Sequence, residues 1–187
     1  MKTGKYILWL LCVAAFLPSC VRCPAGTSTG LPKDYNLAYQ EIYGHCYDSI
    51  PYAVVALDLY SEGLTLNKNH RIQGTGYNLY LSDIFVPDSL LADGEYTSIA
   101  NDQSHIVPFT FLPGQDYEGL PHGLYLLHIE EDKIIGIQVL DSGTMVVKTT
   151  EDGLTDLQFT LHYKNAYGQH VTYTPHFEGA LIPWQKQ

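Results

Sequence analysis

Apolar and polar residues alternate in many short segments of this chain, and the alternation predicts β-strands. In the segment 157–164 every odd position is apolar or aromatic and every even position is polar. This pattern is typical of a strand that buries one face and exposes the other. From Asp34 onward Tyr, Val, Ile, Leu and Thr dominate, and the whole chain has 15 tyrosines. Such side chains favour a pleated, half-buried surface.

The turn that follows this segment predicts its partner strand. Asn165 stands first, and Gly168 stands at the left-handed position, of a type I turn. A three-residue loop of this kind places Tyr163 opposite Val171. The pairing keeps apolar side chains on one face, whereas a shift of one residue would expose them to water. We therefore expect an antiparallel hairpin here.

Further strands are expected along the rest of the chain. They cover 52–60, 74–85, 95–99, 109–111, 124–130, 133–140, 144–149 and 156–164. The segment 37–47, with Gly44 near its end, fits either a short helix or an edge strand. About ten strands with turns at short spacing are typical of a sandwich or a barrel. We expect one all-β domain over 34–187, an antiparallel β-sandwich, with a calycin-like closed barrel as the alternative.

Polar residues within the two central strands mark a second face. Alternation puts Asn78 and Tyr80 on the face opposite to Leu79, and it puts Asp58 on the face opposite to Leu57 and Leu59.

The N-terminal segment predicts export and lipid attachment. Lys2 and Lys5 precede the uncharged run 6–17, which is too short to span a bilayer and is typical of a signal peptide over 1–19. The following Leu17-Pro18-Ser19-Cys20 resembles a bacterial lipobox, although Pro18 departs from the usual small residue. The resemblance implies that Cys20 becomes the new N-terminus and carries lipid. The alternative is an ordinary cleaved signal peptide with a chance cysteine.

The composition after the signal peptide limits the partners. Residues 20–33 are rich in Pro, Gly, Ser and Thr, which is typical of a flexible tether. Without the signal peptide, 8 Lys and Arg stand against 20 Asp and Glu, a net charge of −12. An acidic chain repels nucleic acid and anionic headgroups, so we expect no nucleic-acid partner. Membrane attachment then depends on the lipid at Cys20. We expect the protein in the cell envelope, most simply at the outer membrane, and both the periplasmic and the surface face of that membrane fit the sequence.

Two cysteines remain for a disulfide bond. Cys23 and Cys46 would lie in an oxidising compartment, where a bridge between them would contribute about 3 kcal/mol in the chain-entropy model. The alternative is two unpaired thiols.

Several short phrases carry a second resemblance. They are Tyr43-Gly44, Leu57 to Tyr60, Gly74 to Tyr77 and Asp93 to Tyr96. Over roughly residues 34–184 the chain resembles uncharacterised β-rich envelope lipoproteins of Gram-negative gut anaerobes. Proteins of that kind often neighbour glycan-uptake systems, so the resemblance favours a binding role and implies no catalytic residue.

Motifs for catalysis, metals and cofactors are not found in the sequence. The run Gly74-Thr75-Gly76 precedes a predicted strand, so no helix N-terminus follows it to hold a phosphate. The eight histidines form neither His-x-His nor His-x-x-x-His, and Ser-x-x-Lys does not occur. We expect a protein without a metal or cofactor, and not an enzyme.

One irregular stretch is the candidate ligand site. Asp116, Tyr117, Glu118 and His122 combine an aromatic ring with carboxylates, the groups that recognise the faces and hydroxyls of sugars. The alternative is a surface loop that Tyr117 anchors. We expect a lipid-anchored, non-enzymatic domain that binds an extracellular glycan or protein. The alternatives are a structural component of an envelope or pilus-like complex and a small hydrolase.

Overall fold

The structure is a computed structural model, and it describes residues 30–99 and 106–184. Within these ranges the regular elements are β-strands, which confirms the all-β prediction. The strands are β1 (Asp34–Tyr35), β2 (Leu37–Gly44), β3 (Ala53–Tyr60), β4 (Leu64–Leu66), β5 (Ile72–Gly74), β6 (Gly76–Val86), β7 (Gly94–Ser98), β8 (Thr110–Phe111), β9 (Gln115–Tyr117), β10 (Leu120–His122), β11 (Leu124–Glu130), β12 (Lys133–Val139), β13 (Ser142–Thr149), β14 (Thr155–Lys164), β15 (His170–Tyr173), β16 (His176–Gly179) and β17 (Leu181–Pro183).

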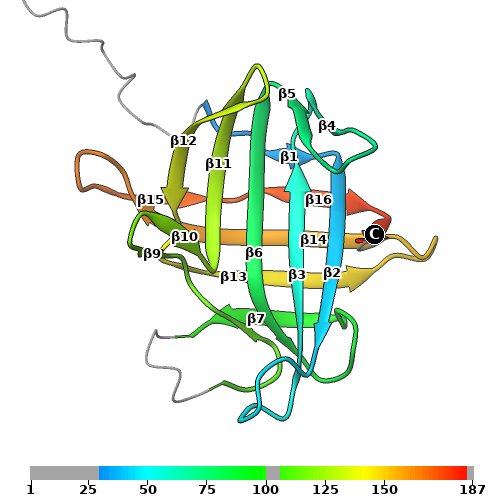
Figure 1. Ribbon diagram of the computed structural model, residues 1–187. Coiled ribbons are helices and arrows are strands. Elements are labelled where there is room, and N and C mark those ends of the chain that lie inside the picture. The colour runs from blue at the N-terminus through cyan, green and yellow to red at the C-terminus, as the bar shows by residue number, and fades with distance from the viewer. Residues whose placement is uncertain (1–29, 100–105, 185–187) are drawn as a thin grey trace, which may run out of the picture.

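Thirteen of these strands belong to one strongly curled sheet that folds into two layers. In Figure 1, β12, β11, β6, β3 and β2 stand side by side in front, and β15, β16, β14, β13 and β7 run across behind them. The short β8 joins the layers, because it pairs with β7 on one side and β6 on the other. The result is a sandwich whose layers are parts of one barrel-like sheet.

The first and last strands of the sheet meet along a parallel seam. β1 and β2 are separated only by Asn36, and β16 and β17 only by Ala180. β1 pairs in parallel with β16, and β2 pairs in parallel with β17. The two ends of the strand order, β1 with β16 and β2 with β17, therefore lie next to each other along the seam. By contrast, within the described residues β12 pairs only with β11, and β15 pairs only with β14. Most other pairings are antiparallel, as predicted; the seam and the β7–β8 pair are the parallel exceptions.

The hairpin predicted from turn chemistry is confirmed in its register. Tyr163 on β14 lies opposite Val171 on β15. The amide of Asn165 donates to the carbonyl of Gln169 at 3.0 Å, and Gly168 has a φ of +74°. The ambiguous segment 37–47 contains strand β2.

The core lies between the layers. Leu57 and Leu79 point inward from the front layer, and Tyr96, Leu157 and Leu161 point inward from the back layer; all five are fully buried. Since burial of such side chains is the main favourable term in folding, these contacts hold the layers together.

The folded body begins before Asp34. Leu31 packs against the core, the carbonyl of Pro32 accepts a hydrogen bond from Tyr173 Oη at 2.7 Å, and the carbonyl of Lys33 accepts one from the His176 amide at 2.8 Å. These residues were assigned to the predicted tether by composition, but they contact β15 and β16. The predicted signal peptide and most of the tether lie outside the described residues.

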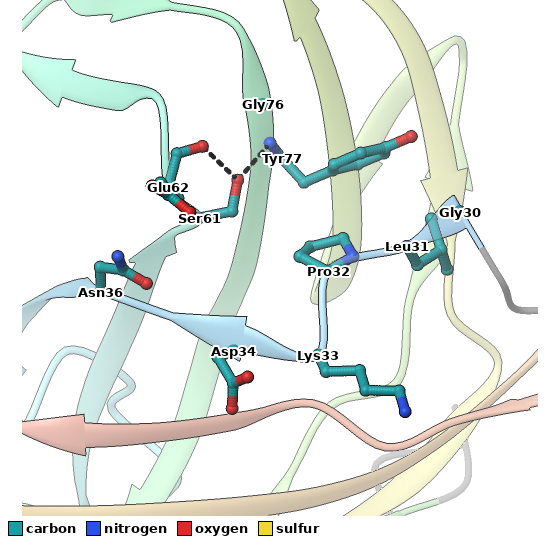
Figure 2. Close-up of a pocket in the computed structure, with 10 residues that line it drawn as sticks. All are labelled: Gly30, Leu31, Pro32, Lys33, Asp34, Asn36, Ser61, Glu62, Gly76 and Tyr77. Atoms are coloured by element: carbon teal, nitrogen blue, oxygen red, sulfur yellow. Dashed lines mark hydrogen bonds between the residues drawn. The ribbon is translucent and has the colours of Figure 1, made fainter.

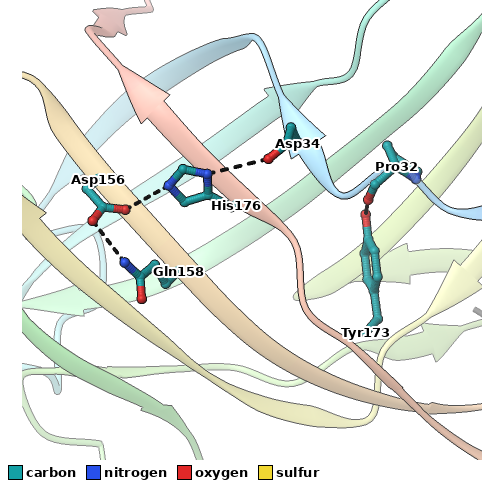
Figure 3. Close-up of polar contacts among 6 residues, drawn as sticks. All are labelled: Pro32, Asp34, Asp156, Gln158, Tyr173 and His176. Carbon is teal, nitrogen blue, oxygen red and sulfur yellow. Dashed lines mark hydrogen bonds and ion pairs between the residues drawn. The ribbon is translucent and has the colours of Figure 1, made fainter.

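Figure 3 shows the polar contacts beside the seam. His176 Nδ1 lies 3.5 Å from Asp34 Oδ1, and His176 Nε2 lies 3.0 Å from Asp156 Oδ1. His176 and Asp34 are 40% and 76% exposed, so solvent screens these contacts. The next residue, Phe177, is 2% exposed and belongs to the core cluster.

We expect the seam to depend on apolar burial more than on these polar contacts. Phe177→Ala should lower the free energy of unfolding by about 3–5 kcal/mol, as for other buried Phe truncations, whereas His176→Ala should lower it by less than about 1 kcal/mol. Urea unfolding of both variants measures this. A loss at His176 equal to that at Phe177 would show that the polar contacts hold the seam.

Candidate functional site

The predicted ligand loop is a small hairpin in the structure. β9 and β10 pair so that Asp116 lies opposite Pro121 and Gln115 lies opposite His122. Alternation therefore puts Asp116 and His122 on opposite faces of the hairpin. Asp116 Oδ1 accepts a hydrogen bond from the Gly119 amide at 2.8 Å, so its carboxylate is part of the turn.

The remaining predicted site residues lie partly in this hairpin and partly elsewhere in the chain. Glu118, at the tip of this hairpin, is exposed and has a φ of +53°. Tyr117 lies on the β9 backbone opposite Leu120. Cys46 is exposed in the β2–β3 connection, whereas Cys20 and Cys23 lie outside the described residues.

A different set of side chains gathers on the outer face of the front layer. A pocket of about 180 Å³ opens there between β2, β3 and β6. It is lined by Tyr39, Glu41, Ala56, Asp58, Tyr80 and Trp184, and we call it the acidic aromatic pocket. The outward position of Asp58 and Tyr80 agrees with the alternation in the sequence.

Asp58 is held by two neutral donors. Tyr60 Oη donates to one carboxylate oxygen and Asn78 Nδ2 to the other; Asn78 Nδ2 also donates to the carbonyl of Leu59 at 3.0 Å. Burial raises the pKa of Asp58 above its usual range; the two hydrogen bonds oppose this rise, and the charge of Glu41 adds to it. Among the described residues the ion pairs all involve histidines, and none includes Asp58.

Aromatic rings form the walls. The ring of Tyr39 meets the ring of Trp184 edge-on at a centroid distance of 5.4 Å, and it meets Tyr60 at 6.0 Å. Tyr80 packs against Tyr125 of β11 at 5.1 Å. Such edge-on and tilted contacts add to the burial energy of the rings and fix their orientation.

Trp184 reaches the pocket because of the seam. β17 pairs with β2, and the Trp184 amide then donates to the carbonyl of Gln40 at 2.8 Å. The His70 ring, in the loop between β4 and β5, lies 4.7 Å from the Trp184 ring. Three separate parts of the chain thus enclose this side of the pocket.

The phenols around the pocket stay protonated at neutral pH. Burial is the largest cause that raises the pKa of Tyr80 and of Tyr125 above the usual value, and the charge of Asp58 raises both further. Tyr43 Oη donates to Glu41 Oε2 at 2.8 Å and lies 3.5 Å from Tyr80 Oη. The pocket therefore presents carboxylate acceptors and aromatic faces, without a phenolate nucleophile.

A larger hollow of about 430 Å³ lies where the chain enters the body (Figure 2). One of its hydroxyls, Ser61 Oγ, accepts from the Tyr77 amide at 2.8 Å and donates to the carbonyl of Glu62, so it is used by the backbone. Tyr77 is the one aromatic residue among the described residues that line this hollow, whereas three aromatic rings line the acidic aromatic pocket. We therefore take the acidic aromatic pocket as the candidate site.

No family model, curated protein or solved structure matches this chain. Within 30–99 and 106–184, no three or more His, Cys, Asp or Glu side chains are arranged to hold a metal ion. In the same ranges no helix has the length and apolar character needed to cross a bilayer.

Sequence reasoning put Asp58 on the face opposite to Leu57, and Tyr80 on the face opposite to Leu79, but did not select either residue for a site. The signal available was Asp58 itself, a charged residue between Leu57 and Leu59 in an otherwise apolar strand. Trp184 gave no such signal, because only its pairing through β17 brings it to β2.

The raised pKa of Asp58 predicts a pH dependence of stability. Below about pH 4, Asp58 is protonated in both the folded and the unfolded state, and its contribution to stability is complete. As pH rises from about 4 to the raised pKa of the folded protein, the unfolded chain releases this proton first, so the contribution is progressively lost. Asp58→Asn cannot ionise and should gain stability relative to the native protein between pH 4 and pH 7. Urea unfolding at both pH values measures the difference.

The control is Asp116→Asn, which removes one negative charge from the exposed β9–β10 hairpin. If the relative stability of Asp58→Asn does not change with pH, Asp58 is not a destabilised buried acid.

Proposed function

We propose that this protein is a lipid-anchored, non-enzymatic domain of the cell envelope that binds an extracellular ligand in the acidic aromatic pocket. The observation that carries the proposal is Asp58, a largely buried carboxylate in an outward-opening pocket with aromatic walls. Buried charges are costly to keep, and titratable groups with shifted pKa values in pockets are concentrated at functional sites.

The size of the pocket favours recognition of a chain end or a single side chain. Pockets for drug-sized ligands usually span about 300–1,000 Å³, and this pocket holds about 180 Å³. A terminal sugar unit of a glycan or one side chain of a protein are groups of the right scale.

A small hydrolase is the second candidate, because Asp58 and Glu41 line one pocket as a glycosidase pair would. Glycoside hydrolysis needs the sugar and the leaving group to be held across the cleaved bond, between the two carboxyl groups. A pocket of this volume has room for the group on one side of that bond only. Asp58 also already accepts hydrogen bonds from Tyr60 and Asn78, so binding without cleavage is the better fit.

The lipid anchor is tested by labelling. Cells grown with labelled palmitate should incorporate label into the native chain and not into Cys20→Ala, because acyl chains worth about 0.8 kcal/mol per buried CH₂ would be attached there. Cys46→Ala is the matched control and should keep the label. Label that survives Cys20→Ala would contradict the anchor.

The binding site is tested on a glycan array and with solubilised envelope proteins. Trp184→Ala should weaken binding of any ligand found by about tenfold or more, because it removes one aromatic wall. Tyr167→Ala, at the exposed β14–β15 turn, is the control and should bind as the native protein does.

The same assays separate the alternatives. If Asp116→Ala abolishes binding and Trp184→Ala does not, the ligand site is the β9–β10 hairpin. A single envelope partner captured equally by all variants would favour a structural role.

A further inference from the structure

We propose that the group bound in the acidic aromatic pocket is an organic ammonium cation, carried on a short alkyl chain. This inference rests on the proposed function and names the chemistry of its ligand. It depends on a match between what the pocket offers and what an ammonium group needs.

The charge of the pocket is the first argument. The described residues that line it include two acids, Glu41 and Asp58, and no Lys or Arg. The carboxylate of Asp58 is held only by the neutral groups of Tyr60 and Asn78, so no residue in the described structure forms an ion pair with it. A cationic ligand would supply the charge that this buried carboxylate lacks.

The balance of donors and acceptors is the second argument. The strongest donors near the carboxylates already donate to them: Tyr60 and Asn78 to Asp58, and Tyr43 to Glu41. An ionised Asp58 has no donor of its own, so any further hydrogen bond to it needs a donor from the ligand. An ammonium group has three donors and no acceptor, whereas a neutral hydroxyl both donates and accepts. The pocket therefore matches ammonium better than a neutral sugar.

The aromatic walls are the third argument. Tyr39, Tyr80 and Trp184 line the same small volume as the carboxylates. A cation near the face of such rings gains about 0.5–2 kcal/mol, with Trp the most favourable. The rings also exclude water, which strengthens the attraction between the cation and the carboxylates.

Calorimetric titration of the full chain, purified in a non-ionic detergent at low salt, tests the inference. n-Butylammonium should bind the native protein at least about tenfold more tightly than 1-butanol, which has the same chain without the charge. Asp58→Asn and Glu41→Gln should each weaken n-butylammonium binding by about tenfold. Asp152→Asn, in the exposed turn between β13 and β14, is the control and should leave it unchanged.

A second pair of probes identifies the carrier of the ammonium group. Tighter binding of n-butylammonium than of glucosamine assigns the site to an alkyl chain such as that of lysine. Tighter binding of glucosamine overturns the alkyl part of the proposal and assigns the site to amino sugars. Circular dichroism of each variant confirms folding, and Glu41→Gln still decides the question if Asp58→Asn does not fold.

The outcomes separate this inference from the proposed function. If n-butylammonium does not bind, or binds Asp58→Asn and Glu41→Gln as tightly as the native protein, the ammonium inference is wrong. If a neutral glycan then binds in a way that depends on Trp184, the proposed function stands without it. If neither class of ligand depends on Trp184, both proposals are wrong.

Discussion

The parallel seam between the two ends of the described chain is the constraint on which the rest of the structure depends. Antiparallel hairpins could have formed an open sheet, but pairing of β1 with β16 and of β2 with β17 curls that sheet until its layers face each other. The fully buried residues lie between those layers. Because His176 and Asp34 are largely in contact with solvent at the seam while Phe177 is buried, we expect apolar packing more than charge to hold the two ends together.

The candidate site is a consequence of the same closure. β2 carries Tyr39 and Glu41, and its pairing with β17 delivers Trp184 to them. The antiparallel neighbours β3 and β6 supply Asp58 and Tyr80 from the other side. A pocket that lies outside the core is therefore built by the strands whose inner faces form the core, which gives rigid support to its side chains.

Burial disfavours the ionised form of Asp58, as the direction of its pKa indicates. A hydrophobic residue at this position would extend the packing around Tyr60, and burial without a cationic partner raises the pKa of the acid. Such a residue is expected where binding chemistry outweighs stability. The nearby β4–β5 hairpin adds Leu64 to the cluster around Tyr60, which offsets part of the cost.

Local patterns in the sequence determined the parts of this protein that depend on neighbours along the chain. The alternation in 157–164 and the turn at Asn165 predicted the β14–β15 register, because a one-residue shift would expose the core face. Likewise, strand periodicity put Asp58 and Tyr80 on the faces opposite to Leu57 and Leu79, and the structure shows that these faces point outward. Composition favoured an all-β domain, which the structure has.

Only the tertiary structure decided which distant segments meet. Parallel pairing carries no turn signal, since its partners are separated by most of the chain, and so the seam and the arrival of Trp184 beside Tyr39 were not predictable. The candidate loop was chosen because it was irregular, yet its residues 115–117 and 120–122 form a hairpin whose faces separate Asp116 from His122. Contacts across a curled sheet depend on three-dimensional closure, and no local pattern of residues encodes that closure.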